Sequence, residues 1–320
     1  MLKRKLIVVL LFALCLMCLC SCGMQNSIKE PEDTRATIVC TTFPAYDAVR
    51  ILTELVKPRE ESDTAFIATE EMHYSAVYCP LYKDDNGDVE LSEEDKGVLE
   101  HAAIVVHNDE PEVVSFLKDK EGILQLSLKE AIMTHGGSDI GMEDYYKNFA
   151  SDSDMNKSEM SAEQALLLDN KSYIWMPLES MAYIMQYIAD KLIGVSMNGD
   201  YYTIAMHYLQ ELAKYDTEYE LLHKISERNT VVVYGDCKFG NLLEYYNIQY
   251  AQAANEDELE TLLKESADMC ILVDSSTPKP KMANTQVFEI NTMTEDVSVG
   301  EDTYLGIVKS NLDNLRKALN

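Results

Sequence analysis

One unusually long helical pattern constrains the fold of this 320-residue chain most strongly. From Asp200 to about Ile225, apolar and aromatic residues recur at spacings of three or four, as they do on one face of an α-helix. They are Tyr201, Ala205, Tyr208, Leu212, Tyr215, Tyr219 and Leu222. At 1.5 Å per residue this helix spans roughly 35 to 40 Å, which is more than one small domain needs. The pattern therefore predicts a helix that bridges two lobes.

Short apolar segments alternate with helical patterns on both sides of this long helix. Strands are expected at residues 36–42, 64–69, 102–107, 230–236, 269–276 and 285–291. Further helices are expected from Pro44, after Ser92, from Leu178 to Gly194, at 239–246, at 256–264 and from Thr303. Strands that alternate with helices in this way favour an α/β fold with a largely parallel sheet.

The first 22 residues have the organisation of a bacterial lipoprotein signal. Basic residues 3–5 precede an apolar run to about residue 20, after which the chain becomes polar abruptly. The stretch Leu19–Cys22 resembles a lipobox, in which the signal is cut and the last Cys, here Cys22, is acylated. An uncleaved membrane anchor stays open as the alternative, because the apolar run has nearly the length of one. In both cases the rest of the chain is expected outside the cytoplasmic membrane.

The charge of the chain argues against nucleic acid as a partner. Residues 1–21 contain three basic and no acidic side chains, so their removal changes the formal charge from −28 to −31. A surface this negative repels nucleic acid and anionic lipid headgroups. It favours solubility more than it favours any one partner.

Neither the cysteines nor the known catalytic motifs indicate an enzyme. Cys40, Cys79, Cys237 and Cys270 remain after the signal without a CxxC spacing, and they predict buried thiols, with one disulfide left open. No P-loop, HExxH, nucleophile elbow or Rossmann glycine set is present in the sequence. A thiol pair of Cys237 with His73 is the one enzymatic alternative.

Polar residues at the predicted strand ends are the candidate ligands, because parallel α/β sheets bind ligands at the carboxyl ends of their strands. They are Thr41, Thr42, His73, Asp236, Asp274 and Asn291. Oxygen donors with one imidazole suit a cation harder than zinc. Polar strand ends also occur in any such fold, because the backbone meets water there.

The order of these segments resembles the zinc/manganese-type substrate-binding lipoproteins of bacterial ABC importers. The resemblance covers about residues 36–318. Its strongest pieces are IVCTTFPAYDAVRIL, YIWMPLES followed by the long helix, VVVYGDCKFGNLLEYYNI, ILVDSS and GEDTYLGIVKSNLDNLRKAL. It implies two α/β lobes, each with a mainly parallel sheet flanked by helices, joined by one long linking helix. One divalent ion, manganese or zinc, is expected between the lobes.

The resemblance also implies how the chain is divided. The expected parts are a signal peptide with lipobox (1–22), a tether (23–34), an N-terminal lobe (35–197), the linking helix (198–225) and a C-terminal lobe (226–320). An acidic loop at 139–163 lies where zinc-type relatives often carry histidines, but it contains none. It is therefore expected to be solvated rather than to collect zinc.

The family's four ligand positions fall on residues that only partly keep the family's chemistry. A His after the second strand corresponds to His73, and a His before an Ile/Val-Trp pair corresponds to Tyr173. The remaining positions, a His or Glu in a strand-to-helix turn and a late Asp or Glu, correspond to Asp236 and Asn291. A phenol, whose pKa is near ~10, rarely binds a divalent ion unless it is deprotonated.

Each of these residues has a structural alternative. Tyr173 is equally consistent with packing beside Trp175, and Asn291 is consistent with a strand-end cap. Asp236 is consistent with a helix N-cap, and His73 is consistent with a histidine that is hydrogen-bonded within the protein. Cys237 and Asp274 are additional candidate ligands, and a thiolate at Cys237 would favour zinc.

The function implied is that of a lipid-anchored, extracytoplasmic binding protein at the cell membrane. It would be a monomer that captures a divalent metal ion as cargo and delivers it to the ABC permease of the same importer, with no role for nucleic acid. The alternative, motivated by Tyr173 and Asn291, is a divergent member that has lost metal binding and binds another ligand or a protein partner.

Overall fold

The structure, a computed structural model, describes nine stretches of the chain. They are residues 36–55, 74–83, 89–135, 162–168, 173–228, 230–265, 269–281, 285–294 and 297–320. All belong to one compact unit, Ala36–Asn320. The predicted signal, tether and Cys22, the strand at 64–69, His73 and residues 139–161 of the acidic loop lie outside the described residues.

The first lobe contains a sheet of four parallel strands in the order β2-β1-β5-β6. The strands are β1 (Ala36–Cys40), β2 (Tyr74–Tyr78), β5 (Ile104–His107) and β6 (Leu124–Ser127). A short antiparallel pair, β3 (Tyr82–Lys83) and β4 (Val89–Glu90), follows β2 in the chain. The inner strands are apolar on both faces, as expected for a parallel sheet that is covered on both sides.

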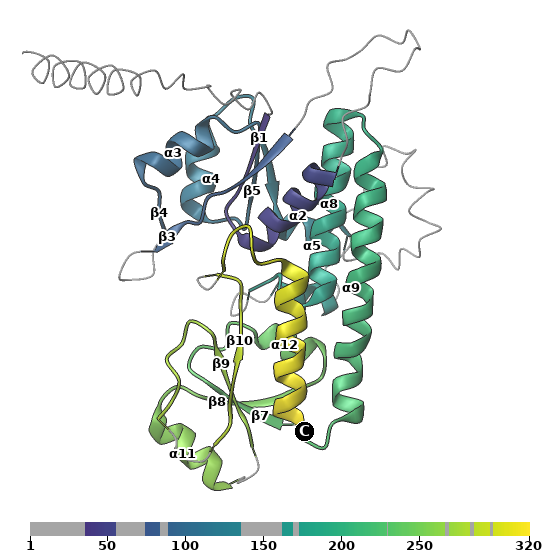
Figure 1. Cartoon of the computed structure of the whole chain (residues 1–320). Helices are drawn as coiled ribbons and strands as arrows, with labels where there is room; N and C mark the ends of the chain where they lie inside the picture. The colour runs from purple at the N-terminus through teal and green to yellow at the C-terminus, as the bar shows by residue number, and fades with distance from the viewer. Residues whose placement is uncertain are drawn as a thin grey trace, which may run out of the picture. The chain divides into compact units, whose positions relative to one another are not determined.

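Helices cover both faces of this sheet (Figure 1). Buried residues on one face pack with α3 (Glu93–Glu100) and α4 (Pro111–Leu117). Buried residues on the other face pack with α2 (Phe43–Leu55), α5 (Leu128–His135), α7 (Ala162–Leu167) and α8 (Leu178–Ser196). Helix α3 begins with a capping box, in which Ser92 and Asp95 bond each other's backbone N–H.

The second lobe repeats the architecture with a sheet of four parallel strands in the order β10-β9-β7-β8. The strands are β7 (Thr230–Tyr234), β8 (Gln249–Ala253), β9 (Ile271–Asp274) and β10 (Val287–Ile290). The helices are α10 (Gly240–Tyr245), α11 (Glu256–Glu265) and α12 (Tyr304–Leu319). The α/β class predicted from the alternation of strands and helices is thereby confirmed.

The long helix α9 (Asp200–Ile225) has the bounds predicted from its apolar periodicity, and it is 26 residues long. Six of the seven residues that defined the pattern are buried, and Tyr215 is partly exposed. The helix packs against α8 and α2 of the first lobe and against α12 of the second, as Figure 1 shows for α8 and α12. Within the described ranges, no helix has both the length and the apolarity that a membrane span requires.

Candidate metal centre

Tyr173 is hydrogen-bonded through its backbone to the turn that follows β7. Its N–H donates to the carbonyl oxygen of Lys238 at 2.8 Å, and the Asn241 side-chain amide donates to its carbonyl oxygen at 2.9 Å. Because Lys238 follows Asp236 by two residues, this contact joins the segments that carry the predicted ligands Tyr173 and Asp236. The two segments come from different lobes.

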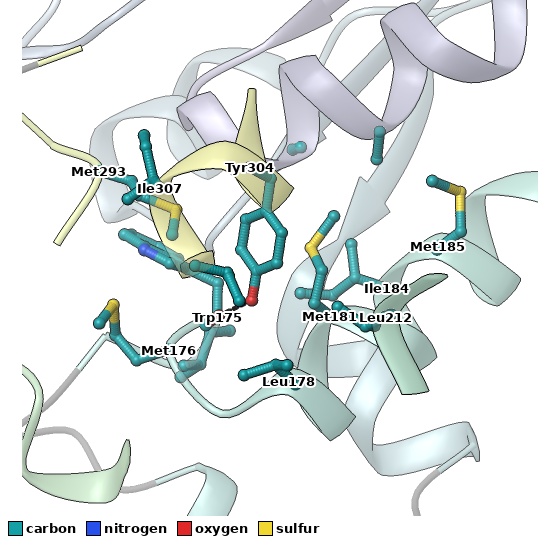
Figure 2. Close-up of a cluster of buried hydrophobic side chains, with 14 of the residues drawn as sticks. Trp175, Met176, Leu178, Met181, Ile184, Met185, Leu212, Met293, Tyr304 and Ile307 are labelled. Atoms are coloured by element: carbon teal, nitrogen blue, oxygen red, sulfur yellow. Dashed lines mark hydrogen bonds between the residues drawn. The ribbon is translucent and has the colours of Figure 1, made fainter. Parts of the chain in front are cut away.

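Trp175 joins the same stretch to the loop after β10. Its indole Nε1–H donates to the carbonyl oxygen of Thr292 at 3.0 Å, and the Tyr304 hydroxyl donates to the Trp175 carbonyl oxygen at 2.8 Å. Figure 2 shows the indole beside Met293 and Ile307, with the Tyr304 ring between Trp175 and Met181. Since Thr292 directly follows Asn291, the segments of three predicted ligands are linked by hydrogen bonds.

The Tyr173 ring is stacked on the indole of Trp175. The ring centroids are 4.8 Å apart and the planes differ by 14°. Tyr173 is only partly buried, whereas Trp175 is 3% exposed. The phenol ring of this predicted ligand therefore covers one face of the tryptophan.

Asp236 is held outward by a tight turn at the end of β7. Gly235 has φ +83°, and a Cβ there would lie 3.2 Å from Cγ2 of Thr277, so the turn requires glycine. The Asp236 side chain is 84% exposed, and the Lys238 Nζ lies 3.9 Å from its carboxylate. The N-cap of α10 is Phe239, so Asp236 does not cap that helix. This leaves its charge accessible to a ligand.

Asn291 is part of a local hydrogen-bonded turn. Its side-chain oxygen accepts a hydrogen bond from the Met293 N–H at 2.7 Å. Its backbone N–H and carbonyl oxygen bond the side-chain amide of Asn311, a residue of α12, each at 2.9 Å. Met293 itself has φ +63°. Asn291 thus makes a strand-end hydrogen bond of the kind that its structural alternative predicts, and its role as a ligand stays a prediction.

Asp274 has both carboxylate oxygens engaged, although it lies at a strand end. One oxygen accepts hydrogen bonds from the backbone and the hydroxyl of Ser276 at 2.9 and 2.8 Å, and the other accepts from the Thr292 hydroxyl at 2.8 Å. The side chain is 3% exposed. These bonds stabilise the end of β9 against the loop after β10.

Cys237 is a free, partly buried thiol. Burial raises the pKa of this thiol to about 12, while a hydrogen bond with Tyr250 acts in the opposite direction. To bind zinc as a thiolate, Cys237 would have to lose its thiol proton when the metal binds.

All four cysteines of the described chain are free. Cys40 and Cys79 lie next to each other, with the Cys79 N–H donating to the Cys40 carbonyl oxygen at 3.0 Å. Their side chains belong to different apolar clusters on opposite faces of the sheet, however, so the sheet separates the two thiols. The disulfide that the sequence left open is not formed between them.

We therefore expect a reducing agent to leave the thermal midpoint of the chain from Gly23 onward unchanged. Burial raises the pKa of Cys79 to about 12, so the native protein should react slowly with a thiol reagent at pH 7. In guanidinium without reductant, all four thiols should react. A count of two would reveal a disulfide and contradict the prediction.

His107 is a strand-end imidazole that is not among the predicted ligands. It ends β5 and is 4% exposed, and its Nδ1 accepts a hydrogen bond from the Asp109 N–H at 3.1 Å. Burial lowers its pKa, although Asp109, Glu110 and Glu130 act in the opposite direction. The sequence does indicate this position, because the predicted strand at 102–107 ends at His107.

Among the described residues, no group of three or more His, Cys, Asp and Glu side chains is arranged to hold a metal ion. One of the four predicted ligands, His73, lies outside that part of the chain. In the sequence it comes directly before β2, whereas the prediction placed it after the second strand. Because β2 runs parallel to β1, its amino end lies at the sheet edge opposite the carboxyl ends at which such sheets bind ligands. The other three supply one carboxylate, one phenol and one amide oxygen. The ligand set proposed from the sequence therefore stays a prediction.

Comparison with protein families identifies the class to which this two-lobed fold belongs. The profile of the family described as "Zinc-uptake complex component A periplasmic" matches residues 83–318. The chain belongs to this family. Its predicted place among the metal-type substrate-binding proteins of ABC importers is thereby confirmed.

Solved structures of similar fold come from several bacteria. The metal-dependent lipoprotein YcdH from Bacillus subtilis has a TM-score of 0.61 at 15% identity, covering 89% of this chain and 100% of its own. The Zn(II)-bound ZnuA-like domain of Streptococcus pneumoniae AdcA has a TM-score of 0.60 at 14% identity. This match covers 89% of this chain and 99% of that domain. The periplasmic zinc-binding protein TroA from Treponema pallidum has a TM-score of 0.58 at 17% identity. This match also covers 89% of this chain and 99% of that protein. A search of curated protein sequences gave no match.

Proposed function

We propose that this protein is an extracytoplasmic substrate-binding lipoprotein that captures one divalent cation between its two lobes and delivers it to an ABC permease. It acts as a monomer, anchored to the cell membrane through a lipid on Cys22. The observation that carries the proposal is the linkage of the Tyr173, Asp236 and Asn291 segments by hydrogen bonds across the two lobes. In a chain of this family, those segments are where a cation would be held.

The proposed ligands favour manganese over zinc. Asp236 supplies the charge, Tyr173 and Asn291 supply neutral oxygens, and His73 supplies the imidazole. Oxygen-rich sets suit hard cations, whereas zinc prefers imidazole and thiolate. Zinc would become the better cargo if Cys237 lost its proton and joined the site.

Capture is expected to involve small local movements rather than wide hinge opening. One apolar cluster continues from the first lobe through Trp175 and α9 into α12, so a large opening would expose buried surface.

The proposal is tested by titrating the chelator-stripped chain from Gly23 onward with manganese, zinc and iron(II), using calorimetry and elemental analysis. We expect one ion per chain with sub-micromolar affinity. The double variant His73→Ala/Asp236→Ala should bind at least about tenfold more weakly, by analogy with the loss caused by removing groups around metal sites. Retained affinity in that variant would contradict the assignment.

A matched control is available on the surface of the same chain. His101 is an exposed residue at the end of α3, and Asp257 lies in the exposed first turn of α11. The variant His101→Ala/Asp257→Ala removes one imidazole and one carboxylate away from the proposed site. Its metal affinity should equal that of the unmodified chain.

A second candidate function rests on an apolar cavity in the same region. This cavity of about 610 Å³ is lined by Tyr46, Tyr78 and Pro80 of the first lobe and by Val297 and Val299 of the second. The rings of Tyr46 and Tyr78 lie 5.6 Å apart. Such a lining suits an organic ligand with an apolar face better than it suits a metal ion. Mass spectrometry of the purified chain distinguishes the two, because an organic ligand retained in place of metal would favour this candidate.

A further inference from the structure

A second cavity lies in a groove between α8 and α9. Its volume is about 480 Å³, and Tyr245 of α10 also lines it. Its apolar lining includes Leu178 and Ala182 of α8 with Leu209 and Ala213 of α9. We refer to this cavity as the α8–α9 groove. Neither its helices nor its lining residues contribute to the proposed metal site.

Three carboxylates also line the α8–α9 groove: Glu179 of α8 with Asp216 and Glu220 of α9. The hydroxyls of Tyr183 and Tyr245 both donate to Glu179, and the Tyr246 hydroxyl donates to Asp216 at 2.5 Å. These phenols fix the direction of two carboxylates without neutralising them. The groove therefore combines an apolar surface with oriented negative charge.

This negative charge is not balanced by neighbouring cations. No Lys, Arg or His is among the described residues that line the groove, and none of the three carboxylates takes part in an ion pair within the described chain. Burial raises the pKa of Asp216, the hydrogen bond from Tyr246 acts in the opposite direction, and the neighbouring charges of Glu220 and Glu179 raise it further. A bound cation would relieve the repulsion among these carboxylates.

We propose that the α8–α9 groove binds a small organic cation, with its apolar body along the helices and its ammonium group at Asp216 and Glu220. An ammonium donates hydrogen bonds to carboxylates and is attracted to the face of a tyrosine ring, here that of Tyr245. The volume falls within the range of roughly 300–1,000 Å³ that small-ligand sites occupy. A bare metal ion fits less well, because no three His, Cys, Asp or Glu side chains of the described residues are grouped to hold one.

The probe for this site is n-octylamine, which has one ammonium group and a flexible apolar chain. It is titrated by calorimetry into the unmodified chain from Gly23 onward, with chelator present so that metal binding plays no part. We expect saturable binding of one molecule per chain, and no comparable binding of n-octanol or octanoate. Equal binding of n-octanol would overturn the requirement for a cation, and failure of n-octylamine to saturate would overturn the site.

Matched double variants separate this site from the general negative charge of the protein. Asp216→Asn/Glu220→Gln removes two charges within the groove and should weaken n-octylamine binding at least tenfold, with an unchanged circular dichroism spectrum. The control Glu211→Gln/Glu218→Gln removes two charges from the same helix, where these residues pair with Lys214 and Arg316. Its affinity should be unchanged. Equal weakening in both variants would show diffuse attraction and overturn the proposal.

Discussion

Replacement of Trp175 by alanine is expected to lower the free energy of unfolding by about 3–5 kcal/mol, the cost typical of truncating a large buried aromatic residue. The indole is 3% exposed and packs in the cluster shared by both lobes. Its loss also leaves the Thr292 carbonyl oxygen without the indole donor and removes the surface on which Tyr173 stacks. The substitution therefore acts on packing and on the link between the lobes together.

Urea unfolding followed by far-ultraviolet circular dichroism measures this effect, because the variant has lost the only tryptophan as a fluorescent probe. The control Trp175→Phe keeps a buried ring but removes the Nε1–H, so it should cost about 1–3 kcal/mol. The difference in unfolding free energy between the alanine and phenylalanine variants then measures the contribution of ring packing. A loss below about 1 kcal/mol for the alanine variant would show that this segment does not join the lobes in solution.

The sequence predicted the fold most accurately where apolar periodicity was strong. The bounds of α9 and the inner strands β1, β5, β7 and β9 lie within the predicted segments, since buried parallel strands are short and apolar throughout. The strands β2, β6 and β8 were not predicted, and each lies at the edge of a sheet. Strand β8, with the sequence QYAQA, shows the reason: an edge strand keeps polar, exposed residues and has little apolar signal.

The candidate site was less predictable, because its residues are distant in sequence and their roles depend on local hydrogen bonds. The resemblance to the family placed Tyr173, Asp236 and Asn291 in segments that the structure links together. Nothing in the sequence around Asn291 showed that its side chain would bond Met293. Similarly, the engagement of both Asp274 oxygens depends on Thr292, a residue from a different strand end.

Replacement of Asp47 by alanine is expected to cost about 3 kcal/mol of stability, near the lower limit for breaking a buried ion pair. Asp47 is completely buried in α2, and its carboxylate accepts from Arg50 Nη2 at 2.6 Å and from the Tyr304 N–H at 2.9 Å. The second bond stabilises the first turn of α12, whose N–H groups have no partner within the helix. Since α2 follows β1 and α12 ends the chain, one carboxylate joins the first and last parts of the fold.

The variant Glu54→Ala is the matched control for this prediction, because Glu54 lies on the same helix and also pairs with Arg50, at 3.5 Å. Its side chain is 58% exposed, so its loss should cost less than about 0.5 kcal/mol in the same urea experiment. Asp47→Asn keeps an oxygen acceptor for the Tyr304 N–H while removing the charge. Its loss of unfolding free energy should lie between those of Asp47→Ala and Glu54→Ala. Equal effects of Asp47→Ala and Glu54→Ala would mean that the bond to α12 contributes nothing. A large effect of Asp47→Ala with a small effect of Asp47→Asn would instead assign the stabilisation to the capping of α12 rather than to the charge of the ion pair.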